Sequence, residues 1–277
     1  MVDDALTVCI VLLWASVLFK VAIAPVHAWF PEVLEGCQGA VSVLLLSVPK
    51  VALMSWLMVS AADVHCLLTL WAVVACSVLS IVLGSLMAYV QLSWRKLLGL
   101  SGTVQLGFVL CCCLGHGASM WLTVVLYMLF YGLVAVLLGS LLYYVAVGSG
   151  GRLLSFLAHG ATVQPMWGLL VGLSCLNLVG LPPLLGFLVK VQVLGLIVAA
   201  GHPSVALMLF GMLVCSSLYY LRLLSWVSGA LSSYGRVLTW HTVLGKGGSV
   251  LLAVCGFVVC IPYGKAGMVG LMLSLSL

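Results

Sequence analysis

The sequence predicts an all-α fold, a polytopic transmembrane helix bundle of about eight spans, two of them broken. Hydrophobic residues make up 65% of the chain and charged residues 5%, whereas soluble domains use about 25% charged residues to solvate their surface. The mean hydropathy is +1.37, and the apolar residues form long windows. The 277 residues have room for about eight spans of roughly 20 residues with short loops, so we expect a single transmembrane domain over 1–277.

The expected spans follow the apolar windows in chain order. They cover residues 5–24, 39–62, 66–91, 97–115, 118–147, 162–200, 203–228 and 247–263. One set of connections carries the basic residues Arg95, Lys96, Arg152, Arg236 and Lys246. The other set carries Asp63, His65, His116, His202 and Lys265. The positive-inside rule therefore assigns the first set to the cytoplasm or matrix, and both termini to the outer side.

A first interruption of the helical pattern is expected near residues 25–36. This stretch contains Pro25, His27, Pro31, Glu32 and Glu35 between two apolar runs. Each proline lacks a backbone N–H, so helical hydrogen bonds are missing here. Irregular backbone at membrane depth is tolerated only where protein or a water-filled cavity surrounds it, as in the broken helices of transporters. We therefore predict a broken helix with Pro25 and Pro31 at the break.

A second break is expected near residues 180–186, because the sixth apolar window is too long for one straight helix. The breaking residues are Gly180, Pro182, Pro183 and Gly186. A single proline is compatible with a kink that only aids packing. Two prolines between glycines, followed by a lysine seven residues later, favour a true break.

Three lysines lie inside apolar windows: Lys20, Lys50 and Lys190. A lysine near the bilayer centre costs about 2.5 to 3.5 kcal/mol on insertion scales, so its presence there indicates a function. The structural alternative is that the four-carbon stem carries the charge to the membrane interface. Lys50 is about 11 residues into its span, which places it near mid-membrane and makes this alternative weakest for it.

Lysine suits a proton relay because a low dielectric disfavours its ammonium form, while a nearby carboxylate favours it again. Glu32 and Glu35 are the acids of the first break, and His27 adds a group that titrates at accessible pH. We therefore predict that protons are moved by Lys20, Lys50, Lys190, His27 and Glu32. The sequence indicates no catalytic residue of its own.

The eleven cysteines do not predict a metal site. Cys111, Cys112 and Cys113 are the one cluster, and consecutive helical residues point about 100° apart, so they cannot jointly bind a metal. We interpret them as small packing residues. The net charge of +5 comes from basic residues spread singly between apolar segments, which argues against nucleic-acid binding.

Five ordered landmarks across the chain resemble one family. They are Phe19-Lys20-Val21 followed by Ala24-Pro25-Val26-His27-Ala28-Trp29-Phe30-Pro31-Glu32-Val33, then Val48-Pro49-Lys50-Val51-Ala52, the stretch from Trp94 to Gly102, the run Gly180-Leu181-Pro182-Pro183 with Gly186, Phe187 and Lys190, and Tyr219-Tyr220-Leu221-Arg222. This order is similar to NADH dehydrogenase subunit 2 of respiratory complex I, the antiporter-like membrane subunit called N in bacteria.

The resemblance implies roles for the three lysines. Lys20 would be the central lysine of the first broken helix, Lys50 the connecting lysine, and Lys190 the lysine of the outward half-channel. It also implies a non-redox, proton-translocating subunit of NADH:ubiquinone oxidoreductase that binds no cofactor or metal itself. We expect a multi-pass protein of the mitochondrial inner membrane, surrounded by lipids and by other membrane-arm subunits in a hetero-oligomer.

Two departures from the family qualify this expectation. Family members have further helices before the one that carries Lys20, including an essential glutamate, and we expect a separate chain to supply them. Gln105 stands where the family usually has histidine, and glutamine does not titrate, so a proton path there needs bridging water. Two alternatives stay open: a structural spacer of the same arm with a disabled channel, and a stand-alone cation/proton antiporter.

Overall fold

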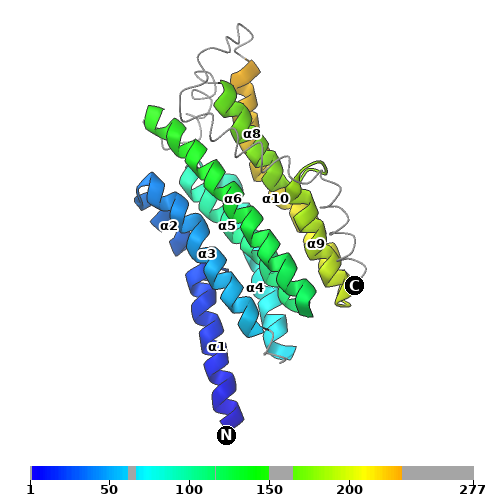
Figure 1. The fold of residues 1–277 in the computed structure, drawn as a ribbon. Helices are drawn as coiled ribbons and strands as arrows, with labels where there is room; N and C mark the ends of the chain where they lie inside the picture. Colours follow the sequence, from blue (N-terminus) through cyan, green and yellow to red (C-terminus); the bar gives the residue numbers. More distant parts are fainter. Residues whose placement is uncertain (1, 62–66, 116, 150–164, 233–277) are drawn as a thin grey trace.

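The computed structural model describes residues 2–61, 67–115, 117–149 and 165–232, and every regular element in these ranges is helical (Figure 1). The elements are α1 (Val2–Val21), α2 (Trp29–Gly36), α3 (Gly39–Ala61), α4 (Leu67–Val90), α5 (Trp94–Cys111), the short 3-10 turn η1 (Cys112–Leu114), α6 (Gly117–Ser149), α8 (Pro165–Val179), α9 (Leu185–Ala199) and α10 (Pro203–Ser232). The expected eighth span, 247–263, lies outside the described residues, as do the predicted loop residues Asp63, His65, His116, Arg152, Arg236, Lys246 and Lys265.

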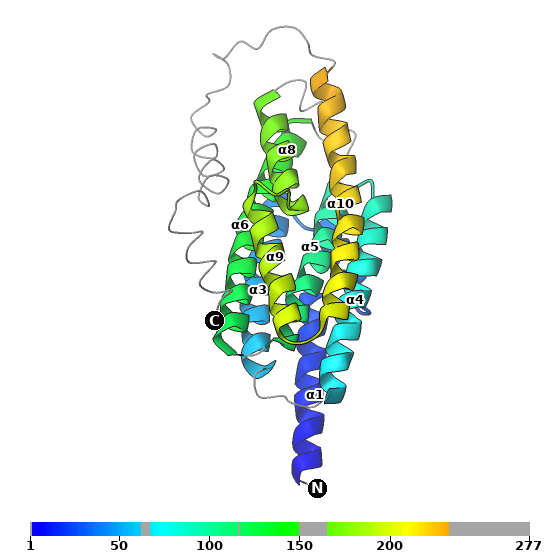
Figure 2. The ribbon, with the colours of Figure 1, turned by 90° about the vertical axis from the view of Figure 1, so that its right-hand side faces the viewer.

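The predicted transmembrane bundle is confirmed. In the described ranges, α3, α4, α5, α6 and α10 are long and apolar enough to cross a membrane. Shorter apolar helices make up α1 and the pair α8 and α9. The sixth expected span is therefore two helices, which follow one another along one line in Figure 2.

Helix α5 forms the centre of the bundle, and its side chains from Leu97 to Cys111 are all buried. It packs closely against α4 because glycine lets the two backbones approach: a Cβ on Gly107 would lie 2.3 Å from Ser80 Oγ. Small residues at such contacts are typical of membrane helices, where close packing replaces the hydrophobic effect. The cysteines that follow, Cys112 and Cys113, are also buried, as expected for packing residues.

The two ends of the bundle are marked by contacts between α4 and α10, which run side by side in Figure 2. At one end, the rings of Trp71 and His202 lie 6.1 Å apart. At the other end, Arg222 donates a hydrogen bond to the Tyr89 carbonyl. Arg95 follows closely after the Tyr89 end of α4. The structure thus places Arg95 and His202 at opposite ends, as the charge pattern predicts.

Candidate functional site

The first break is an unwound segment at residues 22–28 between α1 and α2, so Pro25 lies in the break. Pro31, which was expected at the break, lies instead in the first turn of α2, where a missing backbone N–H costs no helical hydrogen bond. The end of α1 is closed by two backbone hydrogen bonds, from Ala22 N to Phe19 O and from Ile23 N to Leu18 O, both 3.0 Å. Ala22 has a φ of 65°, the left-handed conformation that this type of helix end requires. The indole of Trp29 donates to the same Phe19 carbonyl, so the two half-helices are tied together across the break.

Lys20 lies in the last turn of α1, directly before this break, and its side chain is exposed. The neighbouring side chains of Leu12, Leu13 and Phe19 are exposed as well. In Figure 1 the N-terminal part of α1 extends away from the other helices. The structure thus gives Lys20 no buried environment within the described part of the chain.

Lys50 occupies the middle of α3 and is 2% exposed. Its ammonium lies 3.8 Å from the centre of the Phe30 ring, which α2 supplies. An aromatic face attracts a cation by about 2 kcal/mol when both are desolvated. Among the described residues, Lys50 Nζ has no hydrogen-bond partner. The alternative that the Lys50 side chain carries its charge to the membrane interface is therefore wrong, because the charge stays inside the bundle.

The second broken helix depends on close approach between the end of α8 and the start of α9. A Cβ on Gly186 would lie 1.8 Å from the Asn177 carbonyl oxygen, so only glycine fits. The Asn177 side chain accepts a hydrogen bond of 3.1 Å from Gly186 N. Gly180 ends α8 with a φ of 82°, which favours glycine. Pro182 and Pro183 lie in the exposed connection.

Lys190, on α9, is 7% exposed and faces this junction. Its ammonium donates hydrogen bonds to the carbonyls of Leu178 (2.7 Å) and Val179 (3.0 Å), the last residues of α8. These carbonyls form the negative end of the α8 dipole, which stabilises a cation. The charge of Lys190 is thus balanced by backbone carbonyls inside the bundle. The alternative that its side chain extends to the membrane interface is therefore wrong as well.

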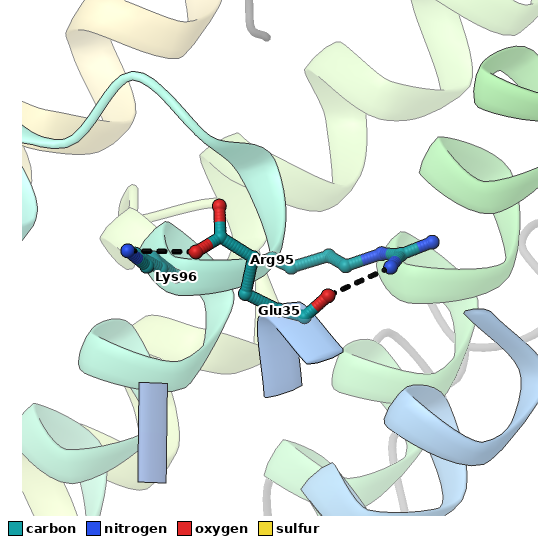
Figure 3. Close-up of polar contacts among 3 residues, drawn as sticks. All are labelled: Glu35, Arg95 and Lys96. Carbon is teal, nitrogen blue, oxygen red and sulfur yellow. Dashed lines mark hydrogen bonds and ion pairs between the residues drawn. The ribbon is translucent and has the colours of Figure 1, made fainter. Parts of the chain in front are cut away.

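Glu32 and Glu35, the two acids near the first break, do not lie beside the buried lysines in the described structure. Figure 3 shows the Glu35 carboxylate in an ion pair of 2.7 Å with Lys96, at the start of α5. Arg95 donates to the backbone carbonyls of Glu35 and Cys37, and so holds the end of α2. Glu32 is exposed on the first turn of α2. These contacts belong to an interhelical connection, and neither carboxylate is paired with Lys20 or Lys50 in the described structure.

His27 is buried in the unwound segment. Its Nε2 lies 3.3 Å from Met87 Sδ on α4, and its Nδ1 has no partner among the described residues. The structure therefore brings His27 next to a thioether rather than next to a predicted lysine.

The centre of the bundle holds a group that the sequence did not reveal, which we call the tyrosine cluster: Gln105 on α5, Tyr127 and Tyr131 on α6, and Tyr219 and Tyr220 on α10. All five side chains are buried. The Tyr127 hydroxyl donates to the Gln105 side-chain oxygen. The spacing of Tyr127 and Tyr131, four residues apart on one helix, was the available signal, because such residues share a face.

The predicted site residues therefore fall into separate places. Lys50 contacts Phe30, Lys190 contacts the end of α8, and Lys20 lies on the exposed side of α1. The tyrosine cluster lies on α5, α6 and α10, which pack against the helices that carry the two buried lysines, α3 and α9. This arrangement provides buried, separately held cations with polar groups in the bundle centre, which suits stepwise movement of a proton.

The family model described as NADH:quinone oxidoreductase/Mrp antiporter, TM, matches residues 2–216. The chain belongs to this family. Subunit N of NADH-quinone oxidoreductase from Granulibacter bethesdensis is 30% identical over 264 residues, which cover 91% of this chain and 55% of that protein. Subunit N 2 from Rhizobium meliloti is 28% identical over 230 residues, covering 80% of this chain and 47% of the relative. The chain spans about half the length of the curated relatives it matches.

Solved structures show the same antiporter-like fold. A chain of respiratory complex I from Thermus thermophilus is similar with a TM-score of 0.71 and 26% identity, over 96% of this chain and 56% of that one. A chain of an archaeal membrane-bound sulfane sulfur reductase reaches a TM-score of 0.77 at 18% identity, over 93% of this chain and 53% of the other. The latter likeness concerns the fold alone. This member of the antiporter family is thus a multi-pass membrane protein.

Proposed function

We propose that this chain is a proton-translocating membrane-arm subunit of an NADH:quinone oxidoreductase, without redox chemistry or a cofactor of its own. The observation that carries the proposal is Lys50, which lies in the middle of α3, 2% exposed and without a hydrogen-bond partner in the described structure. A buried cation of this kind is costly. It is supported by its contact with Phe30 and is expected to gain or lose its proton as neighbouring charges change.

The likeness to subunit N of the bacterial relatives supports the same reading. Lys190 provides a second buried ammonium, whose bonds to the α8 carbonyls are strengthened by its charge. Proton release at Lys190 weakens the attraction across the second break, and proton uptake restores it. Lys190 lies beside a helix break and Lys50 lies in a continuous helix. These two buried lysines are the elements of a stepwise proton path.

Lys20 supports a further part of the proposal, that another chain covers α1. An exposed lysine within a membrane helix is costly in lipid, and such residues face protein and pair with an opposite charge. Since Glu35 is already paired with Lys96, we propose that helices of a neighbouring chain bring a carboxylate to Lys20. A structure of the intact assembly with no carboxylate within ion-pair distance of Lys20 contradicts this.

The compartment is proposed on the resemblance alone. We propose the mitochondrial inner membrane, with ubiquinone as the electron acceptor of the whole assembly. The relatives named above are bacterial, for which the matching membrane is that of the cell. Fractionation of the source cells, with this chain detected by antibody, distinguishes the two locations.

The deciding experiment replaces Lys50 by methionine in the intact assembly. Methionine fills a similar volume and cannot carry a proton, so proton translocation per NADH oxidised falls while the assembly stays intact. Lys96→Met is the matched control, because Lys96 lies near the surface in an ion pair, and it keeps the wild-type ratio. Vesicles containing a pH-sensitive dye provide the measurement. An unchanged ratio in Lys50→Met contradicts proton translocation and favours the structural spacer.

A further inference from the structure

We propose that protons cross the centre of this bundle through the tyrosine cluster and water bound to it, with no residue there that must change its charge. The inference rests on the proposed function and assigns the groups that connect its two buried lysines. It concerns Gln105, Tyr127, Tyr131 and Tyr220. Gln105 does not titrate, so its neighbours decide whether the path is continuous.

The connection begins at Lys50, whose ammonium reaches the backbone of α5 where Gly102 has no side chain. A Cβ on Gly102 would lie 3.0 Å from Lys50 Nζ and 2.7 Å from the Tyr131 hydroxyl oxygen. Both distances are shorter than ordinary contact, so the two polar atoms lie near each other against α5. Neither has a hydrogen-bond partner in the described part of the chain. A group that both donates and accepts hydrogen bonds would satisfy both atoms, and water is the smallest such group.

Gln105 continues the connection one turn further along α5. Its side-chain oxygen accepts from the Tyr127 hydroxyl, while its side-chain nitrogen has no partner among the described residues. Because Tyr127 and Tyr131 are four residues apart on α6 and Gly102 and Gln105 are three apart on α5, the two helices present matching rows. Buried polar atoms are costly unless they are hydrogen-bonded, which favours bound water along these rows.

Tyr220 extends the row toward the second break. Its hydroxyl lies beside Ser101, Tyr219 and Gln105 without forming a well-aligned hydrogen bond. Helix α10, which carries Tyr220, packs against α8, which carries the buried Cys175. Leu178, whose carbonyl binds Lys190, is one turn beyond Cys175 on the same helix. The cluster therefore runs from the Lys50 side of α5 to the helix that holds Lys190.

Hydroxyl groups relay protons without becoming charged overall. A proton released by the Lys50 ammonium passes to the bound water, and the water passes one of its hydrogens to a lone pair of the Tyr131 oxygen. The tyrosine gives its original hydrogen to the next water or hydroxyl oxygen in the same event. Each O–H bond that breaks is replaced by one that forms, so the hydroxyl is regenerated and one proton has moved. Reorientation of the hydroxyls resets the row.

The test uses the intact assembly in vesicles and compares Tyr131→Phe with Tyr144→Phe. The first substitution removes a hydroxyl of the row, and we expect proton translocation per NADH to fall to the level of Lys50→Met, because loss of a proton-transfer group slows its step about 100-fold or more. Tyr144 lies on the same helix, is exposed and stacks on Trp167, so its variant keeps the wild-type ratio.

The outcomes separate this inference from the function on which it rests. Loss in Lys50→Met together with a wild-type ratio in Tyr131→Phe overturns the tyrosine path and leaves the proposed function standing. A wild-type ratio in Lys50→Met overturns both. If Tyr131→Phe does not assemble, an experimental structure of the wild-type assembly with ordered waters decides: water between Lys50 Nζ and Tyr131 supports the path, and a dry contact overturns it.

Discussion

Replacing Gly186 by alanine tests how the second break is held together. The new Cβ would lie 1.8 Å from the Asn177 carbonyl oxygen, whereas ordinary contact begins at 3.4 Å. The start of α9 must therefore move by about 1.6 Å, an overpacking that costs roughly 1–3 kcal/mol. This movement also breaks the 3.1 Å bond from Gly186 N to the Asn177 side chain, worth about 1 kcal/mol. Together these effects destabilise the chain by roughly 2–4 kcal/mol.

For a chain of this size, such a loss lowers the Tm of the purified assembly by roughly 5–15 °C. Thermal unfolding in nanodiscs, followed by intrinsic fluorescence, measures the shift. Gly211→Ala is the control, because a Cβ there meets nothing within 4 Å, and its Tm stays within about 2 °C of wild type. Since Lys190 moves with α9, proton translocation falls in Gly186→Ala alone. Equal melting and equal translocation in the two variants refute the close-approach reasoning.

Two further comparisons probe the ends of helices. Gly180→Ala and Gly201→Ala both place a side chain at a positive φ, which lowers the stability of the chain by about 1 kcal/mol in each case. Only the Cβ added at Gly180 approaches Lys190, at 3.2 Å from its Cδ. Proton translocation is thus expected to fall only in Gly180→Ala, and equal translocation speaks against a role for this contact. Arg95→Gln removes two bonds to backbone carbonyls and destabilises by about 2 kcal/mol. Glu35→Gln removes a surface ion pair, so its effect is small and fades with salt; similar Tm losses in both variants contradict this ranking.

The sequence predicts the breaks and the depth of two lysines because these depend on local chemistry. Proline and glycine interrupt a helix wherever they occur together, and Lys50 lies as far from either end of α3 as its position in the apolar window indicates. The burial of Lys50 and Lys190 follows from the same reasoning, since a cation at mid-membrane is stable only inside protein.

The sequence does not predict which way the side chains face. Helices α3 and α6 are apolar on all sides, so no polar face indicates their orientation. Nothing in the pattern around Tyr127 and Tyr131 therefore shows that both face α5. The ion pair between Glu35 and Lys96 joins residues 61 positions apart in the chain, and only the packing of α2 on α5 brings them together. Glu35 is thus held by Lys96 at the surface of the bundle.

The contacts between α4 and α10 have a mechanical consequence. Trp71 and His202 join these helices at one end, and Arg222 joins them to Tyr89 at the other. Two helices connected at both ends resist sliding and tilting against each other, so we expect α4 and α10 to move together. The junction of α8 and α9 is held by the bonds from Lys190 to the carbonyls of Leu178 and Val179, and from Gly186 N to Asn177. Any displacement of α9 against α8 therefore stretches the bonds that hold the ammonium group.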